Sequence, residues 1–213
     1  TSKYINANSS AISGVITDGG KFKWDTEKYP GMKDFKKFGP FAYTAKLRNG
    51  LFRNTGACLS PQNAFYNSIG METFGLRMER VCDNAKTLAQ FFATEYSDIE
   101  VNYPGLAGSK WHNIATEQFG DKFGGIITIR TGNKKRAFGI IDALKLPLIV
   151  SNIGDTKTLV IHPESTLNVH STQEEKKPAG VFDDLIRISV GIEDIDDLID
   201  DFKQAIESVK DVY

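Results

Sequence analysis

METFGLRMERVCDNAKTLAQFF, residues 71–92, is the stretch that decides the fold of this chain. Its apolar residues recur at steps of three and four, which is the helical period and lays one apolar stripe along one face. Gly75 lies inside the pattern and weakens the helix locally, since glycine is a poor helix former. We therefore expect a long amphipathic helix with a weak point near its start, where two domains could join. The stripe consists of Met71, Phe74, Met78, Val81, Ala85, Leu88 and Phe92.

Short β-branched runs and helical patterns alternate after this helix, which predicts a mixture of strands and helices in one α/β domain. A final amphipathic helix has Glu193 and Asp194 in its first turn, where negative charge suits the helix dipole. We expect strands near residues 99–103, 125–129, 148–150, 158–161 and 185–190, and helices near residues 110–119, 136–145 and 195–209.

The region before the long helix reads differently. Residues 12–17 form a short apolar run that predicts a strand, and Asp18-Gly19-Gly20 predicts a turn. Residues 21–47 are polar, aromatic and irregular, so we expect a long surface excursion with short helical pieces. Because few other strands are predicted near the strand at residues 12–17, we expect this region to be the end of a different domain. We place the boundary between residues 1–69 and residues 70–213.

Composition excludes several classes of function. The formal net charge is −1, so no basic excess points to nucleic acid or to an anionic membrane surface. No apolar run approaches the ~20 residues of a membrane helix. Cys58 and Cys82 lack metal-ligand spacing, and we expect two reduced thiols and no metal site. Reduced thiols favour a cytoplasmic location.

Several ordered motifs together carry a family resemblance. Ser2-Lys3-Tyr4-Ile5 leads through small residues into an apolar run, and further motifs follow in the same order along the chain. Together they resemble the Cys/Met-metabolism family of pyridoxal-phosphate enzymes, in particular its O-acetylhomoserine sulfhydrylase branch. The resemblance covers essentially the whole chain. The motifs are VITDGGKF (15–22), GACLSPQNAF (56–65), GMETFGLRMER (70–80), SNIGDTKTL (151–159) and DLIRISVGIE (184–193).

The resemblance implies a fold and a set of site residues. The fold would be the end of the large pyridoxal-phosphate domain (fold type I, aspartate-aminotransferase-like) plus a smaller C-terminal α/β domain. Lys3 matches the lysine that attaches the cofactor covalently. Ser2 matches the hydroxyl residue that helps to hold the cofactor phosphate. Arg187 and Ser151 match residues that bind the carboxylate of the amino-acid substrate.

Arg187 also stands out without any resemblance, because it interrupts the apolar run Leu185–Val190. A buried arginine is costly unless it is paired. Its planar fork can bind a carboxylate through two hydrogen bonds, and it stays charged at every relevant pH. Residue pattern alone leaves two alternatives open, which are a structural ion pair and the carboxylate of a substrate.

The sequence also departs from the family pattern. The turn after the lysine is Asn6-Ala7-Asn8-Ser9, where the family usually has Gly-Gly-His-Gly or a similar run. Since asparagine tolerates positive φ, we expect the turn to survive. Asn168 stands where relatives often have histidine, and Thr166 aligns with a segment near the active site. We expect the three histidines, His112, His162 and His170, to be surface or core residues.

The expected activity is replacement at the γ-carbon: O-acetylhomoserine and sulfide, or a thiol, would give homocysteine, or a thioether, and acetate. Cystathionine γ-synthase and methionine γ-lyase remain alternatives within the family. The resemblance implies a homotetramer, and it assigns most cofactor contacts to an N-terminal half that this chain, beginning at Thr1 without methionine, is expected to lack. A non-catalytic fragment is therefore a further alternative.

Overall fold

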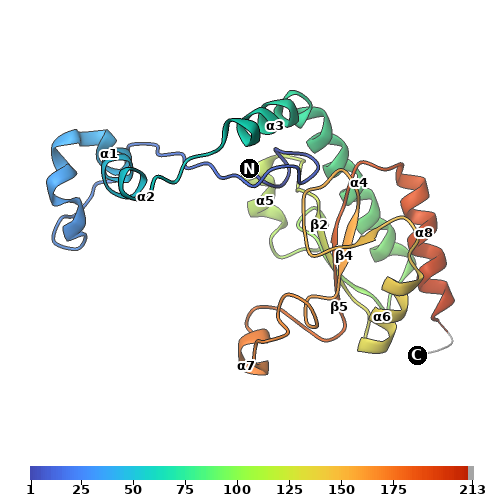
Figure 1. Cartoon of the computed structure of the whole chain (residues 1–213). Coiled ribbons are helices and arrows are strands. Elements are labelled where there is room, and N and C mark those ends of the chain that lie inside the picture. Colours follow the sequence, from blue (N-terminus) through green and yellow to red (C-terminus); the bar gives the residue numbers. More distant parts are fainter. Residues whose placement is uncertain (211–213) are drawn as a thin grey trace.

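A five-stranded mixed sheet, with strand order β1-β2-β5-β4-β3, forms the centre of the computed structural model, which describes residues 1–210 (Figure 1). Neighbouring strands pair antiparallel, except that β3 joins β4 in parallel at one edge. Each strand overlaps a predicted run, so these predictions are confirmed. The strands are β1 (Glu100–Asn102), β2 (Ile126–Arg130), β3 (Leu148–Ile149), β4 (Leu159–Ile161) and β5 (Leu185–Ser189).

Three helices cover one face of this sheet: α4 (Phe74–Glu95), α6 (Lys134–Ala143) and α8 (Ile195–Ser208) (Figure 1). Their apolar stripes meet the strand residues that point to the same side, because strand side chains alternate between faces. A mixed α/β fold with one covered sheet face follows, as expected. The core includes Ala85, Leu88, Phe92, Ile127, Ile129, Ile140, Ile186, Ile188, Leu198 and Phe202.

The opposite face of the sheet carries half-buried polar side chains on the neighbouring strands β2 and β5. Thr128 and Arg130 point to it from β2, and Arg187 points to it from β5. The register places Thr128 directly opposite Arg187, so the two side chains lie side by side on this face. The helix α5 (His112–Phe119), which was predicted near residues 110–119, follows a loop at the β1 edge.

The long predicted helix is broken near its start. α3 (Pro61–Glu72) and α4 meet at Thr73, whose φ of −108° and ψ of 6° are not helical. The break falls two residues before Gly75, and the apolar stripe is buried only from Val81 onward, while Met71 is 61% exposed. α3 itself was not predicted, although Ser60 caps it by accepting a hydrogen bond from Asn63 N at 3.2 Å.

The strand predicted at residues 12–17 is wrong. This segment has no regular secondary structure, and Ile12 is 86% exposed. A strand needs a neighbouring strand to satisfy its backbone groups, and no strand among residues 1–210 pairs with this segment. The apolar sequence is therefore extended but unpaired.

Residues 20–55 form an arm that projects away from the sheet (Figure 1). It contains the short helical pieces that were predicted for this region. Its own small cluster is aromatic, with Trp24 stacked on Tyr43 at a centroid distance of 5.7 Å and an interplanar angle of 7°. The pieces are η1 (Pro30–Phe41), α1 (Ala42–Lys46), η2 (Leu47–Phe52) and α2 (Arg53–Thr55).

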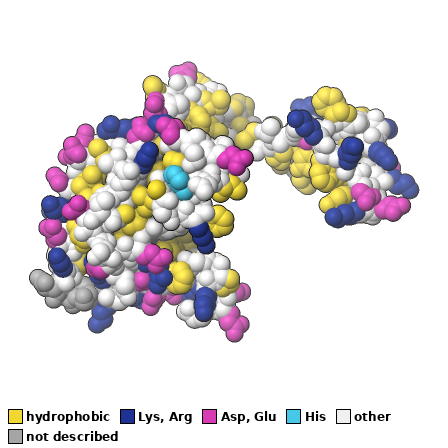
Figure 2. All heavy atoms as spheres, turned by 180° about the vertical axis from the view of Figure 1, so that it is seen from behind, with side chains coloured by type: hydrophobic (Ala, Val, Ile, Leu, Met, Phe, Trp, Pro, Cys, Tyr) yellow, Lys and Arg dark blue, Asp and Glu magenta, His cyan; other side chains and the backbone are white. Residues whose placement is uncertain are grey.

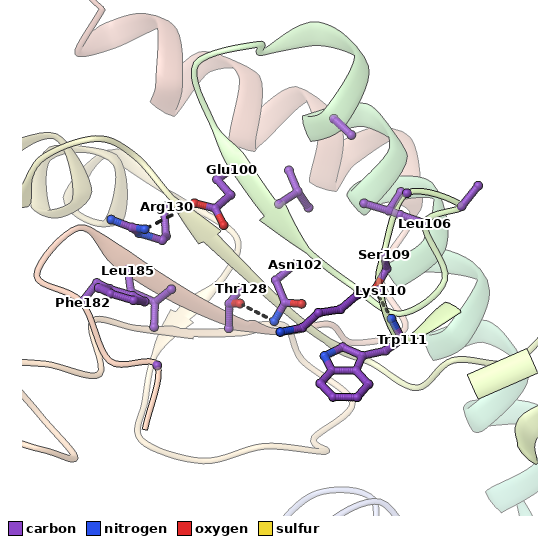
Figure 3. A pocket seen from close by; sticks show the side chains of 15 residues that line it. Glu100, Asn102, Leu106, Ser109, Lys110, Trp111, Thr128, Arg130, Phe182 and Leu185 are labelled. Atoms are coloured by element: carbon purple, nitrogen blue, oxygen red, sulfur yellow. Dashed lines mark hydrogen bonds and ion pairs between the residues drawn. The ribbon is translucent and has the colours of Figure 1, made fainter. Parts of the chain in front are cut away.

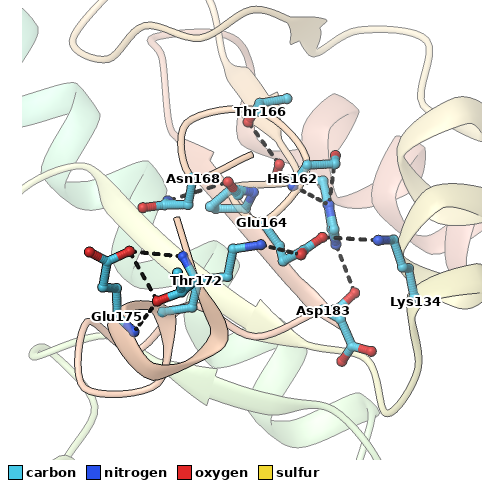
Figure 4. Close-up of polar contacts among 11 residues, drawn as sticks. Lys134, His162, Glu164, Thr166, Asn168, Thr172, Glu175 and Asp183 are labelled. Atoms are coloured by element: carbon cyan, nitrogen blue, oxygen red, sulfur yellow. Dashed lines mark hydrogen bonds and ion pairs between the residues drawn. The ribbon is translucent and has the colours of Figure 1, made fainter. Parts of the chain in front are cut away.

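The loop between β4 and β5, which includes α7 (Gln173–Lys176), is fastened by a charged cluster (Figure 4). The Glu164 carboxylate accepts hydrogen bonds from Lys176 Nζ at 2.6 Å and from Lys134 Nζ at 2.9 Å. Since Lys134 belongs to α6, Glu164 ties the loop to the body of the domain. The two ammonium groups lower the pKa of Glu164 to about 2.

Glu164→Gln should lower the free energy of unfolding by about 1–3 kcal/mol at pH 7, because two charge-assisted hydrogen bonds are weakened. The depressed pKa means that Glu164 contributes its full stabilisation above its ordinary value of 4.5, and that this contribution is lost as pH falls toward about 2. Urea unfolding of both proteins at pH 7 and pH 2 measures the difference.

Glu174→Gln, in the exposed first turn of α7, is the matched control and should change stability little. An equal loss for both variants, or a Glu164→Gln loss that persists undiminished at pH 2, would contradict the assignment.

Candidate functional site

Residues 1–13 form a closed loop that carries Lys3. The Ser2 hydroxyl donates to Ser13 O at 3.0 Å and accepts from Ser13 N at 2.8 Å, which closes the loop. Positive φ occurs at Ala7 (80°) and Ser9 (61°) and not at Asn6 or Asn8, so the conformation of the turn does not depend on the tolerance of asparagine for positive φ. Asn6 is buried instead and accepts a hydrogen bond from Ser10 N at 2.6 Å, which fixes the turn through its side chain.

Asn152 joins the two residues that were predicted to be most important. Lys3 Nζ donates to Asn152 Oδ1, and Arg187 Nη2 donates to Asn152 O at 3.1 Å. Asn152 lies in the turn after β3, while Lys3 and Arg187 come from the first loop and from β5. The fold therefore brings an amine and a guanidinium from opposite ends of the chain to one residue.

Arg187 has its charge available. The side chain is half-buried in the middle of β5, and burial lowers the pKa of its guanidinium. Within residues 1–210 no carboxylate forms an ion pair with it. The structural ion pair that the sequence left open therefore finds no support in the described part of the chain. A partly desolvated guanidinium with spare donors is suited to an incoming carboxylate.

Asn152 was not predicted from the sequence, whereas its neighbour Ser151 was. Ser151 is exposed, and no hydrogen bond of its side chain occurs within the described residues. The Asn152 side chain also donates through Nδ2 to Ser9 Oγ at 2.6 Å, and Ser9 Oγ donates to Asp155 Oδ2 at 3.2 Å. The role of Ser151 stays a prediction. The SNIGD motif was the available signal, and only the structure shows which of its residues points inward.

Gly154 allows this turn to approach the Lys3 loop closely. Its φ is +72°, and a Cβ atom built there would lie 2.8 Å from Tyr4 N and 3.1 Å from Lys3 Cβ. Its N–H donates to Ser189 Oγ at 2.9 Å, which ties the turn to the end of β5. Position 154 therefore needs a residue without a side chain, for reasons of both conformation and space.

A groove of about 800 Å³ lies on the sheet face that carries Thr128 and Arg130 (Figure 3). Thr128, which is paired with Arg187 in the sheet, accepts a hydrogen bond from Asn102 Nδ2 at 3.3 Å and lines the groove. Lys110 extends along it toward Asn102, and the exposed ring of Trp111 forms its far wall. The sheet face that carries Arg187 therefore extends, through Thr128, into a groove with polar and aromatic walls.

The other residues singled out in the sequence make local contacts or are exposed. The buried His162 bonds through its ring nitrogens to Ser165 Oγ at 2.9 Å and to Asp183 O at 2.7 Å. Thr166 and Asn168 bond to main-chain oxygens of the same loop (Figure 4). His112 contacts Pro104 O at 2.9 Å, and His170 is exposed.

The described part of the chain offers few side chains for thiol or metal chemistry. Cys58 and Cys82 are both free, and burial raises the pKa of the Cys82 thiol. In the described part of the chain no group of three His, Cys, Asp or Glu side chains could hold a metal ion. Among the helices of residues 1–210, none combines the length and apolar character needed to cross a membrane.

Comparison with known proteins defines the class. The profile of the Cys/Met metabolism PLP-dependent enzyme family matches residues 1–207, so the chain belongs to this family. It is 36% identical to Sulfhydrylase FUB7 of Fusarium oxysporum f. sp. lycopersici over 96% of its length, and 37% identical to the O-acetyl-L-homoserine sulfhydrylase of Corynebacterium glutamicum over 97%.

A solved structure from Campylobacter jejuni, which contains N'-pyridoxyl-lysine-5'-monophosphate, matches 97% of the chain with a TM-score of 0.85 and 33% identity. This match confirms the fold class inferred from the sequence motifs. The chain spans 50% and 51% of the two curated relatives and 52% of the solved chain. It therefore corresponds to about half the length of the proteins that it resembles.

Gly154→Ala should release the Lys3 loop, because the added methyl group overlaps Tyr4 and Lys3. Gly180→Ala is a matched control, since Gly180 has a φ of +69° and open space around it. Both variants should cost about 1–2 kcal/mol for the left-handed conformation. Only Gly154→Ala should accelerate tryptic cleavage after Lys3, relative to cleavage after Lys21 in the arm. Equal cleavage in both variants would show that the contact does not hold the loop.

Proposed function

We propose that the complete protein is a pyridoxal-phosphate-dependent transferase that acts as an O-acetylhomoserine sulfhydrylase. The observation that carries this proposal is the meeting of Lys3 and Arg187 at Asn152. An amine that can attach a carbonyl cofactor and a guanidinium that can bind a carboxylate are the two groups that amino-acid chemistry on this cofactor requires. The sulfhydrylases among the relatives support the choice of reaction.

The residues present fit the cofactor. Lys3 is exposed, and its amine contacts only the neutral amide of Asn152 within the described chain, so no carboxylate holds it as an ammonium ion pair. Lys3 would attach the cofactor. Ser2 would help to hold its phosphate, once its hydroxyl hydrogen turns away from Ser13 O. The family resemblance assigns the other cofactor contacts to an N-terminal half.

The substrate would be an amino acid with its carboxylate on Arg187. A forked guanidinium fixes the orientation of a carboxylate as well as its position. Asn152 would set the distance between the bound carboxylate and the Lys3 amine, because its backbone oxygen holds Arg187 and its side chain holds Lys3. Ser151 would reach the same carboxylate from the turn.

The reaction exchanges one bond for another at the γ-carbon. The bond to the acetate oxygen breaks, a bond to the sulfur of sulfide or a thiol forms, and acetate leaves with the electron pair. The cofactor, when bound, supplies an electron sink for the proton removals that make the γ-carbon reactive. Lys3 Nζ would accept and return the protons at the α- and β-carbons, because it meets Asn152 beside Arg187, which would bind the carboxylate of the amino acid.

The predicted partners are further copies of the protein, in a tetramer, and an N-terminal half of the same enzyme. Apolar side chains gather on the arm, bordered by Lys and Arg side chains (Figure 2). Phe41 is 72% exposed and Leu51 is 62% exposed, which is unusual for large apolar residues. Such a surface is suited to being covered by these partners. The predicted location is the cytoplasm.

Reduction with borohydride in the presence of pyridoxal phosphate should leave a pyridoxyl group on Lys3, detected by peptide mass in the complete protein. Lys3→Ala should abolish the labelled peptide and the visible absorption band. Lys21→Ala, which removes an exposed lysine in the arm, should change neither. Retention of the same band in Lys3→Ala would refute the assignment of the lysine.

Arg187→Lys keeps the positive charge but loses the fork. It should raise the KM for O-acetylhomoserine on the order of 10- to 100-fold, while the KM for sulfide changes little. Steady-state kinetics with each substrate varied in turn make the comparison, and Arg80→Lys, at an exposed arginine of α4, is the control. A similar rise for both substrates would show a general defect and not a lost carboxylate contact.

A further inference from the structure

The break between α3 and α4 lies directly against the Lys3 loop, and Arg77 occupies the contact. Arg77 Nη1 donates to Tyr4 O at 2.7 Å, and Nη2 donates to Gly70 O at 2.6 Å and to Ile5 O at 3.4 Å. Its Nε donates to Thr73 Oγ1 at 3.0 Å. One guanidinium therefore bonds the end of α3, the break itself and the two residues that follow Lys3.

This guanidinium has no acidic partner among residues 1–210, and burial lowers its pKa. Three of its four acceptors are main-chain carbonyl oxygens. The guanidinium donates hydrogen bonds to carbonyl groups that have no partner in regular secondary structure. Hydrogen bonds from a charged donor are stronger than those between neutral groups. Arg77 therefore holds main-chain segments together and does not neutralise an acidic side chain.

One face of α3 completes the contact. Asn63, Asn67 and Gly70 are spaced by four and three residues, so they share a face. Asn63 Nδ2 donates to Ile12 O at 3.1 Å, and Asn67 Nδ2 donates to Ser13 Oγ at 2.8 Å. A Cβ atom at position 70 would overlap Ile5 O, so the backbones touch there. The whole face receives the loop through polar contacts.

On its other side the same loop is held by the turn after β3, through Asn152 and Gly154. The Lys3 loop therefore lies between the helix break and that turn, with Arg77 on one side and Asn152 on the other. Arg77 bonds both Thr73 at the break and Tyr4 next to Lys3, so the break and the loop belong to one connected set of contacts.

We propose that Arg77 is a positioning residue, which fixes the main chain at Tyr4 and Ile5 so that the Lys3 amine meets Asn152 and Arg187. This inference rests on the proposed role of Lys3. Arg77 touches neither substrate nor cofactor; it acts through the carbonyl groups of the loop. The break in the helix then transmits the orientation of α4 to the lysine.

The test compares Arg77→Lys and Arg77→Met with Arg80→Met in the complete protein with pyridoxal phosphate. Arg80 lies one turn further along α4 and is exposed, with a 3.8 Å pair to Asp194. The first readout is amide hydrogen exchange at residues 4–7, where Asn6 N and Ala7 N bond within the loop at 3.2 Å. Exchange there should be about 10- to 100-fold faster in Arg77→Met, with no comparable change in β5.

The second readout is kinetic. Arg77→Met should lower kcat about 10- to 100-fold while the KM for O-acetylhomoserine changes less than about twofold, since Arg187 is untouched. Arg77→Lys should recover part of both effects, because an ammonium can still donate to one or two of the carbonyls. If Arg77→Met fails to fold, Arg77→Lys alone decides. Arg80→Met should match the wild type in both readouts.

Unchanged exchange at residues 4–7 in the folded Arg77 variants would overturn the inference, as would an equal acceleration in β5, which marks a general loss of stability. The proposed function can fail separately. If the wild-type protein does not attach pyridoxal phosphate at Lys3, that function is refuted, while the exchange at residues 4–7 still decides whether Arg77 holds the loop.

Discussion

The two hydrogen bonds that reach Asn152, one from Lys3 and one from Arg187, are the link on which the functional arrangement depends. The loop that carries Lys3 contributes no residue to the main hydrophobic core, so it depends largely on polar contacts. Each of these contacts is worth only about 1 kcal/mol net. Such a loop keeps one position only while its contacts act together. This explains why several side chains from different elements contact residues 1–13.

The stability of the chain is therefore unevenly distributed. The sheet and its three covering helices bury the large aliphatic side chains, whereas the arm exposes Phe41, Leu51 and other apolar residues. Burial of apolar surface is the main driving force of folding, so the arm has less of this stabilisation than the sheet and its covering helices.

Hydrophobic periodicity predicted the five strands and the three core helices because burial imposes a regular repeat on the sequence. It failed for residues 12–17, where the repeat is present but the neighbouring strand is not. It gave no sign of Asn152 or of the turn geometry at Ala7 and Ser9, because single polar contacts between distant segments leave no periodic trace. The motifs located the right turn, and only coordinates could separate Ser151 from Asn152.

The position of β3 has a consequence for handling the protein. This strand is two residues long and lies at the sheet margin, where Leu148 and Ile149, and Val150 just after them, are exposed. An edge strand with unpaired backbone groups can pair with a strand of another molecule. The short length of β3 and the preceding Pro147 oppose such pairing. Asn152 follows only two residues after Val150. Substitutions that reduce aggregation at this margin would therefore fall within a few residues of Asn152, which contacts both Lys3 and Arg187. Solubility and the geometry of the candidate site cannot be changed independently there.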